Sequence, residues 1–449
     1  MPAAVTVIRT VKNSKDRLSE KEPLVFQEQE FDTPSVLLDS QHRFQVIEGF
    51  GGAFTESAAD TFYKLPPDAR AEILKAYFHP SAGNRYTLCR THINSCDFSL
   101  GNYAYSEVPG DVELKHFSIE RDRRVLIPMI KEAVRTSGQP LKILASPWSP
   151  PAWMKTNGQM NRGGKLKPEY REAWSRYFVR YLEEYAREGL SIWGITVQNE
   201  PQAVQAWESC IYSAEEERDF VRGYLGPALE NAGLLGHLKL LIWDHNRDLL
   251  FERAKAIYDD AEASRFVWGA AFHWYMGDHF HNVQVTHDAY PEKQLLFSEG
   301  CVEGRQPPDE WEIGERYGRS ILEDLNHWAA GWIDWNLLLD QSGGPNHKSN
   351  FCIAPLMADT DKGTLQYHSS YYYIGHLSRF VRPGARRIVS ASTLDELETT
   401  AFLNADGQIA AVVMNRSENS HRFSLKYNGL AALADSPPRS ISTYLLHEA

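Results

Sequence analysis

The chain has 449 residues, of which 43% are hydrophobic and 12% are aromatic. This composition supports a large buried core and argues against a disordered chain. The 47 basic and 59 acidic residues give a net charge of −12, which excludes nucleic acid and anionic membrane surfaces as probable partners, because both need a cationic face.

From about residue 46 to residue 380, short apolar runs typical of strands alternate with longer amphipathic runs. The strand-like runs begin near Val46, Tyr86, Leu141, Ile192, Leu238, Phe266, Gln294 and Gly331. The helical pattern is clearest at 174–185, and the spacing of Ser213 and Glu216 predicts a capping box at the start of another helix. Eight such alternations predict an α/β fold, the (β/α)8 TIM barrel. A doubly wound open sheet is the alternative, disfavoured because no GxGxxG motif follows the first strand.

After Pro383 and Gly384 the sequence changes to short β-prone runs separated by Asn, Asp, Gly and Ser turns. This pattern predicts an antiparallel β-sandwich domain appended to the barrel. The C-terminal runs are few for a closed sandwich, so we expect the extended pieces at 5–9, 23–27 and 35–38 to complete it. The predicted domains are a catalytic barrel at 46–380 and a sandwich built from both chain ends, 1–45 plus 381–449.

The cysteine pattern points to free, buried thiols. The five cysteines are Cys89, Cys96, Cys210, Cys301 and Cys352, and they form neither a CxxC pair nor a Cys/His cluster with zinc-ligand spacing. The first residues lack the apolar core of a signal peptide, and no window approaches the length of a membrane span. We therefore expect a cytoplasmic protein without stable membrane insertion, or a secreted or periplasmic one if a signal segment has been trimmed.

Two glutamates stand at the ends of predicted barrel strands. Glu200 ends the fourth strand and Glu299 ends the seventh. Because barrel strands end at one face, both carboxylates should meet across one mouth. Facing carboxylates suit glycoside hydrolysis, in which one donates a proton and the other attacks the anomeric carbon or activates a water. The alternative is that one or both are structural ion-pair partners.

Other strand ends carry side chains that suit a sugar site. Arg90, on the second strand, is placed to keep a carboxylate ionised, although a salt bridge in the barrel floor is an equal alternative. Flat aromatic rings gather at the third, sixth and eighth strand ends, where we expect a sugar-facing group. Its members are Trp148, Trp153, Trp274, Tyr275, Trp332 and Trp335. His273 is expected to be a core histidine with satisfied hydrogen bonds.

The sequence has no GxSxG, HExxH or P-loop motif, so we expect neither a cofactor nor a catalytic metal. His273, His279 and His281 are the nearest candidate ligands, and their spacing matches no recognised metal site.

Several long motifs resemble glycoside hydrolase family 30, and within it the glucosylceramidase (acid β-glucosidase) branch. They are GFGGAFTE at 49–56, SCDFS at 95–99, ASPWSPPAWMKTNG at 145–158, NEP at 199–201, SE at 298–299, WIDWN at 332–336 and GGPN at 343–346. The resemblance implies a retaining β-glycosidase with Glu200 as acid/base and Glu299 as nucleophile. It also implies that Tyr275 lies beside the nucleophile. The implied sugar-binding residues are Asp97, Trp148, Asn199, Trp335 and Asn346, with Asn199 on the 2-hydroxyl.

The sequence thus predicts a glycoside hydrolase that cleaves β-D-glucosidic bonds by double displacement. The expected substrate is a β-glucoside, a glycolipid or a β-glucan. Endo-β-1,6-glucanase and β-xylosidase or β-fucosidase activity are alternatives within the same family. A non-catalytic carbohydrate-binding protein on a degenerate barrel is the alternative from another class, and the presence of both carboxylates argues against it.

Overall fold

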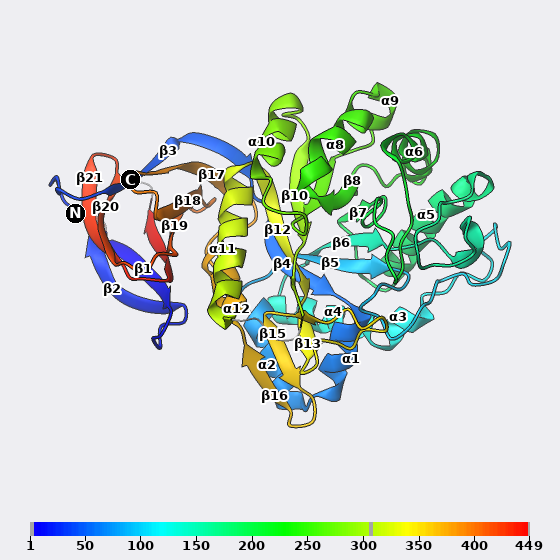
Figure 1. The fold of residues 1–449 in the computed structure, drawn as a ribbon, viewed down its shortest axis with the longest axis horizontal. Helices are drawn as coiled ribbons and strands as arrows, with labels where there is room; N and C mark the ends of the chain where they lie inside the picture. The colour runs from blue at the N-terminus through cyan, green and yellow to red at the C-terminus, as the bar shows by residue number, and fades with distance from the viewer. Residues whose placement is uncertain (1–3, 305–308, 448–449) are drawn as a thin grey trace.

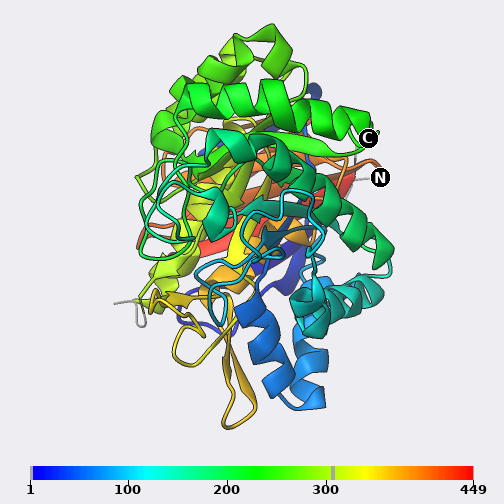
Figure 2. The same cartoon turned by 90° about the vertical axis from the view of Figure 1, so that its right-hand side faces the viewer.

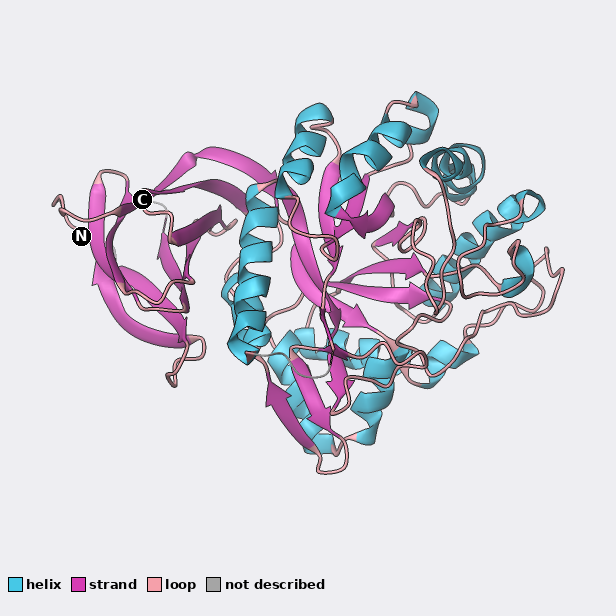
Figure 3. Ribbon diagram, viewed as in Figure 1, coloured by secondary structure: helices cyan, strands magenta, loops and turns pink. Residues whose placement is uncertain are grey.

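The computed structural model describes residues 4–304 and 309–447, which form a barrel and a β-sandwich joined side by side (Figure 1). Helices gather around the barrel strands, whereas the sandwich consists of strands and loops (Figure 3). Among the described helices, none combines the length and the apolar character needed to cross a bilayer.

Eight parallel strands close the barrel, in the order β10-β12-β4-β5-β6-β7-β8-β9. The predicted α/β barrel with an appended sandwich is therefore confirmed. The barrel strands are β4 (Gly49–Phe54), β5 (Leu88–Ile93), β6 (Lys142–Pro147), β7 (Gly194–Thr196), β8 (Lys239–Asn246), β9 (Gly269–His273), β10 (Gln294–Glu299) and β12 (Ala329–Asn336).

Apolar side chains from six strands fill the barrel interior, which is a packed core and not a pore. This inner cluster comprises Leu88, Leu144, Leu241, Ala271, Leu296 and Ile333. Close contact between strands leaves no room for a side chain at Gly51, where a Cβ atom would lie 1.9 Å from the carbonyl oxygen of Leu88. The glycines of the first strand thus serve barrel closure.

The helices pack outside the strands through amphipathic faces. The predicted aromatic stripe at 174–185 lies on α5, and the predicted capping box at Ser213 opens α6. The principal helices are α1 (Glu56–Lys64), α2 (Pro67–Phe78), α3 (Glu120–Arg124), α4 (Leu126–Ser137), α5 (Arg171–Arg187), α6 (Ala214–Phe220), α7 (Gly226–Asn231), α8 (Leu250–Tyr258), α9 (Ala261–Ser264), α10 (Phe280–Ala289), α11 (Glu310–Asn326) and α12 (Ser369–Ser378).

The sandwich is a nine-stranded sheet in the order β2-β1-β22-β19-β18-β17-β3-β20-β21. Strands from both chain ends interleave, because β1 pairs with β22, and β3 lies between β17 and β20. Its strands are β1 (Ala4–Val11), β2 (Ser19–Val25), β3 (Ser35–Val46), β17 (Arg386–Ser392), β18 (Leu397–Leu403), β19 (Gln408–Asn415), β20 (His421–Tyr427), β21 (Leu430–Ser436) and β22 (Ser440–His447).

Two features of this domain differ from the expected antiparallel sandwich. The pairing of β3 with β20 is parallel. The strand β21 was not expected from the sequence, because its run LAALADS is rich in alanine, which is depleted in strands. The long loop expected after the eighth barrel strand also contains structure, a small sheet of β13 (Leu338–Asp340), β15 (Leu356–Asp359) and β16 (Thr364–Tyr367).

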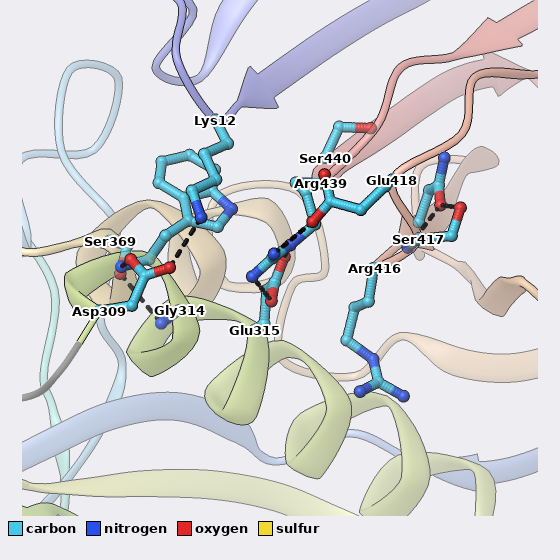
Figure 4. A network of polar contacts seen from close by, with 12 residues as sticks. Lys12, Asp309, Gly314, Glu315, Ser369, Arg416, Ser417, Glu418, Arg439 and Ser440 are labelled. Atoms are coloured by element: carbon cyan, nitrogen blue, oxygen red, sulfur yellow. Dashed lines mark hydrogen bonds and ion pairs between the residues drawn. The ribbon is translucent and has the colours of Figure 1, made fainter.

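Charged side chains join the sandwich to α11 of the barrel (Figure 4). Arg439 donates to both carboxylate oxygens of Glu315, at 2.6 and 2.7 Å, and its remaining terminal nitrogen donates to Glu418. Lys12 pairs with Asp309 at the start of the same helix, at 2.7 Å. A bidentate pair fixes orientation as well as distance, so these contacts define how the two domains meet.

The buried histidine His376, on α12, bridges the two ends of the chain. Its ring nitrogens lie 2.8 Å from the Thr443 hydroxyl on β22 and 2.9 Å from the Thr10 hydroxyl on β1. Because Thr443 donates its own proton to the His376 carbonyl, it accepts from Nδ1, and Thr10 donates to Nε2. Burial lowers the pKa of His376 to about 3, so the ring is neutral in the folded protein.

This histidine should make the fold sensitive to acid. Its pKa is lower in the folded than in the unfolded chain, so stability is lost as the pH falls below the unfolded value of about 6.5. We expect the lowered pKa of His376 to reduce the free energy of unfolding by about 2 kcal/mol at pH 5. Between pH 7 and pH 5, the free energy of unfolding should fall by about 2 kcal/mol less in His376→Gln than in wild type. Denaturant titration at the two pH values measures this difference. The exposed His237→Gln control should retain the wild-type pH dependence, and a loss equal to that of wild type in His376→Gln would contradict the assignment.

Candidate active site

A cavity of about 510 Å³ opens where the barrel strands end. Strands β5 and β6 point toward the right of Figure 1, the side that faces the viewer in Figure 2. Seven of the nine residues predicted to be catalytic, sugar-binding or nucleophile-supporting line the cavity, whereas Arg90 and Asn346 do not. The seven are Asp97, Trp148, Asn199, Glu200, Tyr275, Glu299 and Trp335.

Glu299, the last residue of β10, is held by two donors. The Tyr275 hydroxyl donates to one carboxylate oxygen at 2.9 Å, and the Arg90 guanidinium donates to the other. The side chain is almost fully buried. This arrangement fixes the carboxylate in place and stabilises its ionised form.

Arg90 lies on β5 beneath the cavity, with no exposed surface. Besides Glu299, it donates to the Asn199 side-chain oxygen and to Asp244, both at 2.8 Å, and to the Ser146 hydroxyl at 3.1 Å. Its guanidinium also lies 4.7 Å from the ring centre of Trp148. A single cation therefore joins groups from four neighbouring strand ends.

Glu200 faces the cavity with 13% of its side chain exposed. Its backbone has a φ of 48°, which is uncommon for a residue with a side chain and marks a strained turn after β7. The closest charged neighbour is His273, whose Nδ1 lies 3.4 Å from a Glu200 oxygen. Glu200 is thus less buried and less tightly held than Glu299.

His273 lies between the acids Glu200 and Asp244, and its Nε2 is 3.0 Å from Asp244. Burial favours the neutral ring, but the charge of Glu299 and hydrogen bonds to Asp244 and Glu200 raise the pKa of His273 to about 9. Burial likewise opposes ionisation of Asp244, yet Arg90 and His273 hold the pKa of that carboxyl far below its usual range. At neutral pH, His273 is positive and Asp244 is negative.

Glu200 and Glu299 are close enough for the charge of one to affect the ionisation of the other, since one oxygen of each lies within 4.8 Å of the other. Burial raises the pKa of Glu299, although the charges of His273 and Arg90 act against the rise. Burial acts in the same direction on Glu200, but contact with His273 and the charge of His245 lower the pKa of that group. Two acids this close titrate as a pair, so the macroscopic pKa values belong to both.

Aromatic rings and amides build the inner part of the cavity. Trp148 and Trp335 are stacked, with ring centres 5.1 Å apart. Asp97 lies nearby, and burial raises its pKa to about 8 against a hydrogen bond from Asn350. Asp97 therefore titrates near neutrality and can accept from or donate to a hydroxyl group. Flat apolar rings beside such partners suit a sugar ring.

Asn346 does not line the cavity, but its amide nitrogen donates to the cavity residue Asp97 at 3.4 Å. Its side-chain oxygen accepts from the backbone amides of Lys348 and Asn350, at 2.8 and 3.1 Å, and so shapes the loop. Asn350 lines the cavity and donates to Asp97 at 3.0 Å. Sequence reasoning did not select Asn350, because two asparagines four positions apart in one loop cannot be distinguished before the turn is known.

Three tryptophans expected to face the sugar lie elsewhere. Trp274 and Trp332 are buried on the outer side of the strands, 5.9 Å apart between ring centres, and do not line the cavity. The reason is the two-residue period of a strand, which turns Trp332 outward where Ile333 and Trp335 face inward. Trp153 is half-buried and lines a separate surface hollow.

Asp244 and His273 were missed as members of the site. The expectation that His273 is a satisfied core histidine does not describe its position between two acids. Asp244 ends the apolar run of β8, so its buried strand position was a usable signal. Their contacts with Arg90 and Glu200 arise only when four strand ends meet.

Within residues 4–304 and 309–447, Glu200, His273 and Glu299 form the group whose ligand atoms approach closely enough for a metal ion. A metal needs a neutral imidazole with a free lone pair. The raised pKa of His273 and its contact with Asp244 favour the protonated ring instead. The chemistry of these side chains thus fits proton transfer better than metal binding.

Loops after β7, β8 and β9 form the outer wall of the cavity. This wall is mixed in character, with amides, charged groups, an indole and a thioether. Its members include Gln202, Gln205, Trp207, His245, Asp248 and Met276. A buried carboxylate pair below a sugar-sized, aromatic-lined hollow defines the protein as a glycoside hydrolase.

The sequence comparisons identify the family. The chain matches the glycosyl hydrolase family 30 TIM-barrel domain over residues 47–381 and the family 30 beta sandwich domain over residues 384–444. It belongs to glycoside hydrolase family 30.

Three similar proteins are a glucosylceramidase, a β-1,6-glucanase and a protein of known crystal structure. Lysosomal acid glucosylceramidase of Mus musculus is 37% identical over 91% of this chain and 82% of its own length. An endo-1,6-beta-D-glucanase of Neurospora crassa is 32% identical over 86% of this chain and 81% of its own length. The crystal structure of SrfJ from Salmonella typhimurium is 39% identical with a TM-score of 0.95, covering 99% of this chain and all of that one.

The Tyr275 hydrogen bond yields a test of how Glu299 titrates. If Glu299 must be ionised for activity, removing a donor raises its pKa, and activity disappears at a higher pH on the acidic side. A hydrogen bond to a charged group contributes about 1.5–3 kcal/mol, so we expect Tyr275→Phe to shift the acidic limb of kcat/KM upward by about one pH unit. The matched control is Tyr290→Phe, whose hydroxyl donates to the exposed Asp259. An unmoved acidic limb in Tyr275→Phe would count against this role.

Proposed function

We propose that the protein is a retaining β-glucosidase, with Glu299 as the nucleophile and Glu200 as the general acid/base. The observation that carries this proposal is the approach of the two carboxylates, which have an oxygen of each within 4.8 Å. Retaining glycosidases place their carboxyl groups about 5–5.5 Å apart, whereas inverting ones leave about 6.5–9.5 Å for a water.

The first step would form a covalent glycosyl-enzyme. Glu299 attacks the anomeric carbon while Glu200 donates its proton to the glycosidic oxygen, and the bond from carbon to that oxygen breaks. The firmly held position of Glu299 suits a nucleophile, because Arg90 and Tyr275 fix both carboxylate oxygens. The partial exposure of Glu200 suits a group that must exchange protons with water.

In the second step the roles of Glu200 reverse. The ionised Glu200 takes a proton from water, which attacks the anomeric carbon and releases Glu299 as a carboxylate. The proton of Glu200 thus goes to the leaving oxygen in the first step and is replaced from water in the second. His273 stays protonated throughout, and its charge together with that of Arg90 offsets the charges of Asp244 and of the ionised glutamate.

The inner cavity supports a glucose-like glycone. Stacked Trp148 and Trp335 would contact an apolar sugar face, while Asp97 and Asn350 would bind peripheral hydroxyl groups. The Asn199 side-chain oxygen accepts from Arg90, so the amide nitrogen of Asn199 is left to bind the hydroxyl on the sugar carbon next to the anomeric carbon. The substrate class we propose is a β-D-glucoside.

The mixed outer wall would receive the aglycone. Relatives named glucosylceramidase and endo-1,6-β-glucanase support either a glycolipid or a β-glucan on this side. On a β-1,6-glucan, exo-action would release glucose alone, whereas endo-action would give a ladder of oligosaccharides. Cleavage of glucosylceramide, compared with that of an aryl glucoside, would test the glycolipid as substrate. Faster cleavage of aryl xyloside or fucoside than of aryl glucoside would overturn the proposed glycone.

Substitution of each carboxylate should give a distinct kinetic signature. We expect Glu299→Gln to lower kcat at least about 10³-fold with every substrate, because no covalent intermediate forms. Glu200→Gln should slow alkyl glucosides by about 10²–10⁴-fold and activated aryl glucosides far less, since a good leaving group needs no proton. The exposed Glu292→Gln is the control. Equal losses on both substrate types in Glu200→Gln would refute the acid role.

The stereochemistry of the product tests the mechanism directly. Two displacements at the anomeric carbon restore its configuration, so the first sugar released from a β-glucoside should be the β-anomer. Proton NMR during the first minutes of hydrolysis, before mutarotation, measures this ratio. Initial release of the α-anomer would exclude double displacement.

A further inference from the structure

Two cysteines meet at the edge of the catalytic cavity. Cys301 follows Glu299 by two residues, and Cys352 opens the short strand β14 (Cys352–Ile353), which pairs with β11 (Val302–Glu303). Their sulfur atoms lie 3.2 Å apart, and both residues line the cavity. Among the described residues, the other three cysteines do not line it.

Each thiol is attached to a different part of the catalytic machinery. The Cys301 sulfur lies 3.5 Å from the Tyr275 hydroxyl, which donates to Glu299. Cys352 follows Asn350 by two residues in the loop that reaches Asp97. A covalent link between the sulfurs would therefore act on both the nucleophile side and the sugar side of the cavity.

We propose that Cys301 and Cys352 form a redox-active dithiol that a peroxide converts to a disulfide, and that this disulfide lowers turnover. Peroxide is small enough to enter a cavity built for a sugar ring. The paired strands β11 and β14 hold the two sulfurs together before any reaction, so the second step is intramolecular.

The oxidation balances with one peroxide molecule. The Cys352 thiolate, which accepts the hydrogen bond from Cys301, attacks a peroxide oxygen, the oxygen–oxygen bond breaks, and the released hydroxide takes a proton to form water. The resulting sulfenic acid is attacked by the Cys301 thiolate, which forms the sulfur–sulfur bond and expels a second hydroxide as water. The dithiol thus loses two electrons and two protons, and a dithiol reductant reverses the reaction by exchange.

The surroundings of the pair make it a slow sensor. The hydrogen bond from Cys301 favours ionisation of Cys352, but burial still raises the pKa of that thiol above its usual value, and the pKa of Cys301 is raised further by Cys352 and by burial. Because the thiolate is the reactive form, oxidation should be slow at neutral pH and faster as the pH rises. The pair therefore remains reduced until peroxide exposure is prolonged.

Formation of the disulfide should lower the rate by displacing the residues next to the two cysteines. A disulfide bond is about 2.05 Å long, so the sulfurs must approach each other by about 1 Å. This movement draws Cys301 or Cys352 away from its present neighbours, Tyr275 on one side and the Asn350 loop on the other. A misplacement of about 1 Å at reacting groups costs up to about 10²-fold in rate.

The experiment treats the reduced full-length protein with hydrogen peroxide and follows two independent readouts. Thiol titration after denaturation should fall from five to three, and peptide mapping should find Cys301 linked to Cys352. In parallel, kcat on an aryl β-glucoside should fall at least about tenfold and recover with dithiothreitol. Five remaining thiols, a different linked pair, or an unchanged kcat in the linked protein would overturn the proposal.

Matched variants separate this pair from other oxidation. The double variant Cys301→Ala/Cys352→Ala should keep three thiols under peroxide and show no dithiothreitol-reversible loss relative to its own untreated activity. Cys210→Ala, which retains the pair, should fall from four thiols to two. If the double variant does not fold, peptide mapping and reductant recovery in wild type still decide the outcome.

The activity readout rests on the proposed function, whereas the thiol count and the peptide map do not. A reduced enzyme that cleaves no β-glucoside would count against the proposed function alone. Failure to form the linked pair would count against the dithiol alone.

Discussion

The contact of Arg90 with Asp244 and Glu299 is the interaction on which the catalytic mouth depends. Taking charges out of water costs several kcal/mol per ion, and that cost is offset only when every donor and acceptor is occupied. Here Ser146 and Asn199 each accept from a further N–H of the guanidinium, so that four of its five donors have partners. The charges also balance. Arg90 and His273 are positive and Asp244 is negative, so the cluster is neutral when one of Glu200 and Glu299 is protonated and the other is ionised.

This neutrality explains how five ionisable groups coexist within a barrel that is otherwise apolar. The interior below them is filled by leucine, isoleucine and alanine side chains, which cannot solvate a charge. Loss or gain of a proton in the glutamate pair unbalances the cluster, which favours the state in which the two carboxyl groups carry one proton in total. The loops above carry no such constraint, so they are free to vary with the aglycone.

Much of the fold follows from the sequence because its strands are apolar runs of similar length at regular spacing. The starts of eight such runs lie within three residues of the observed barrel strands. The chemistry at strand ends was readable for the same reason, since Glu200 and Glu299 are polar residues that end apolar runs. The features that the sequence does not predict are which face of a strand a residue occupies and which residues of different strands come into contact. Trp332 and Trp335 differ only in which face of β12 they occupy, and the partners of His273 are distant in sequence.

The interleaving of chain ends in the sandwich has a consequence for biogenesis. Strand β1 precedes the barrel in the chain, whereas its neighbour β22 follows it. Pairing across the whole chain length is slow because the intervening chain must first be ordered. The β1–β22 pairing therefore becomes available only after the whole barrel segment has been synthesised, whereas β1 and β2 can pair before it. The ion pair of Arg439 with Glu315 has the same dependence, because Arg439 directly precedes β22.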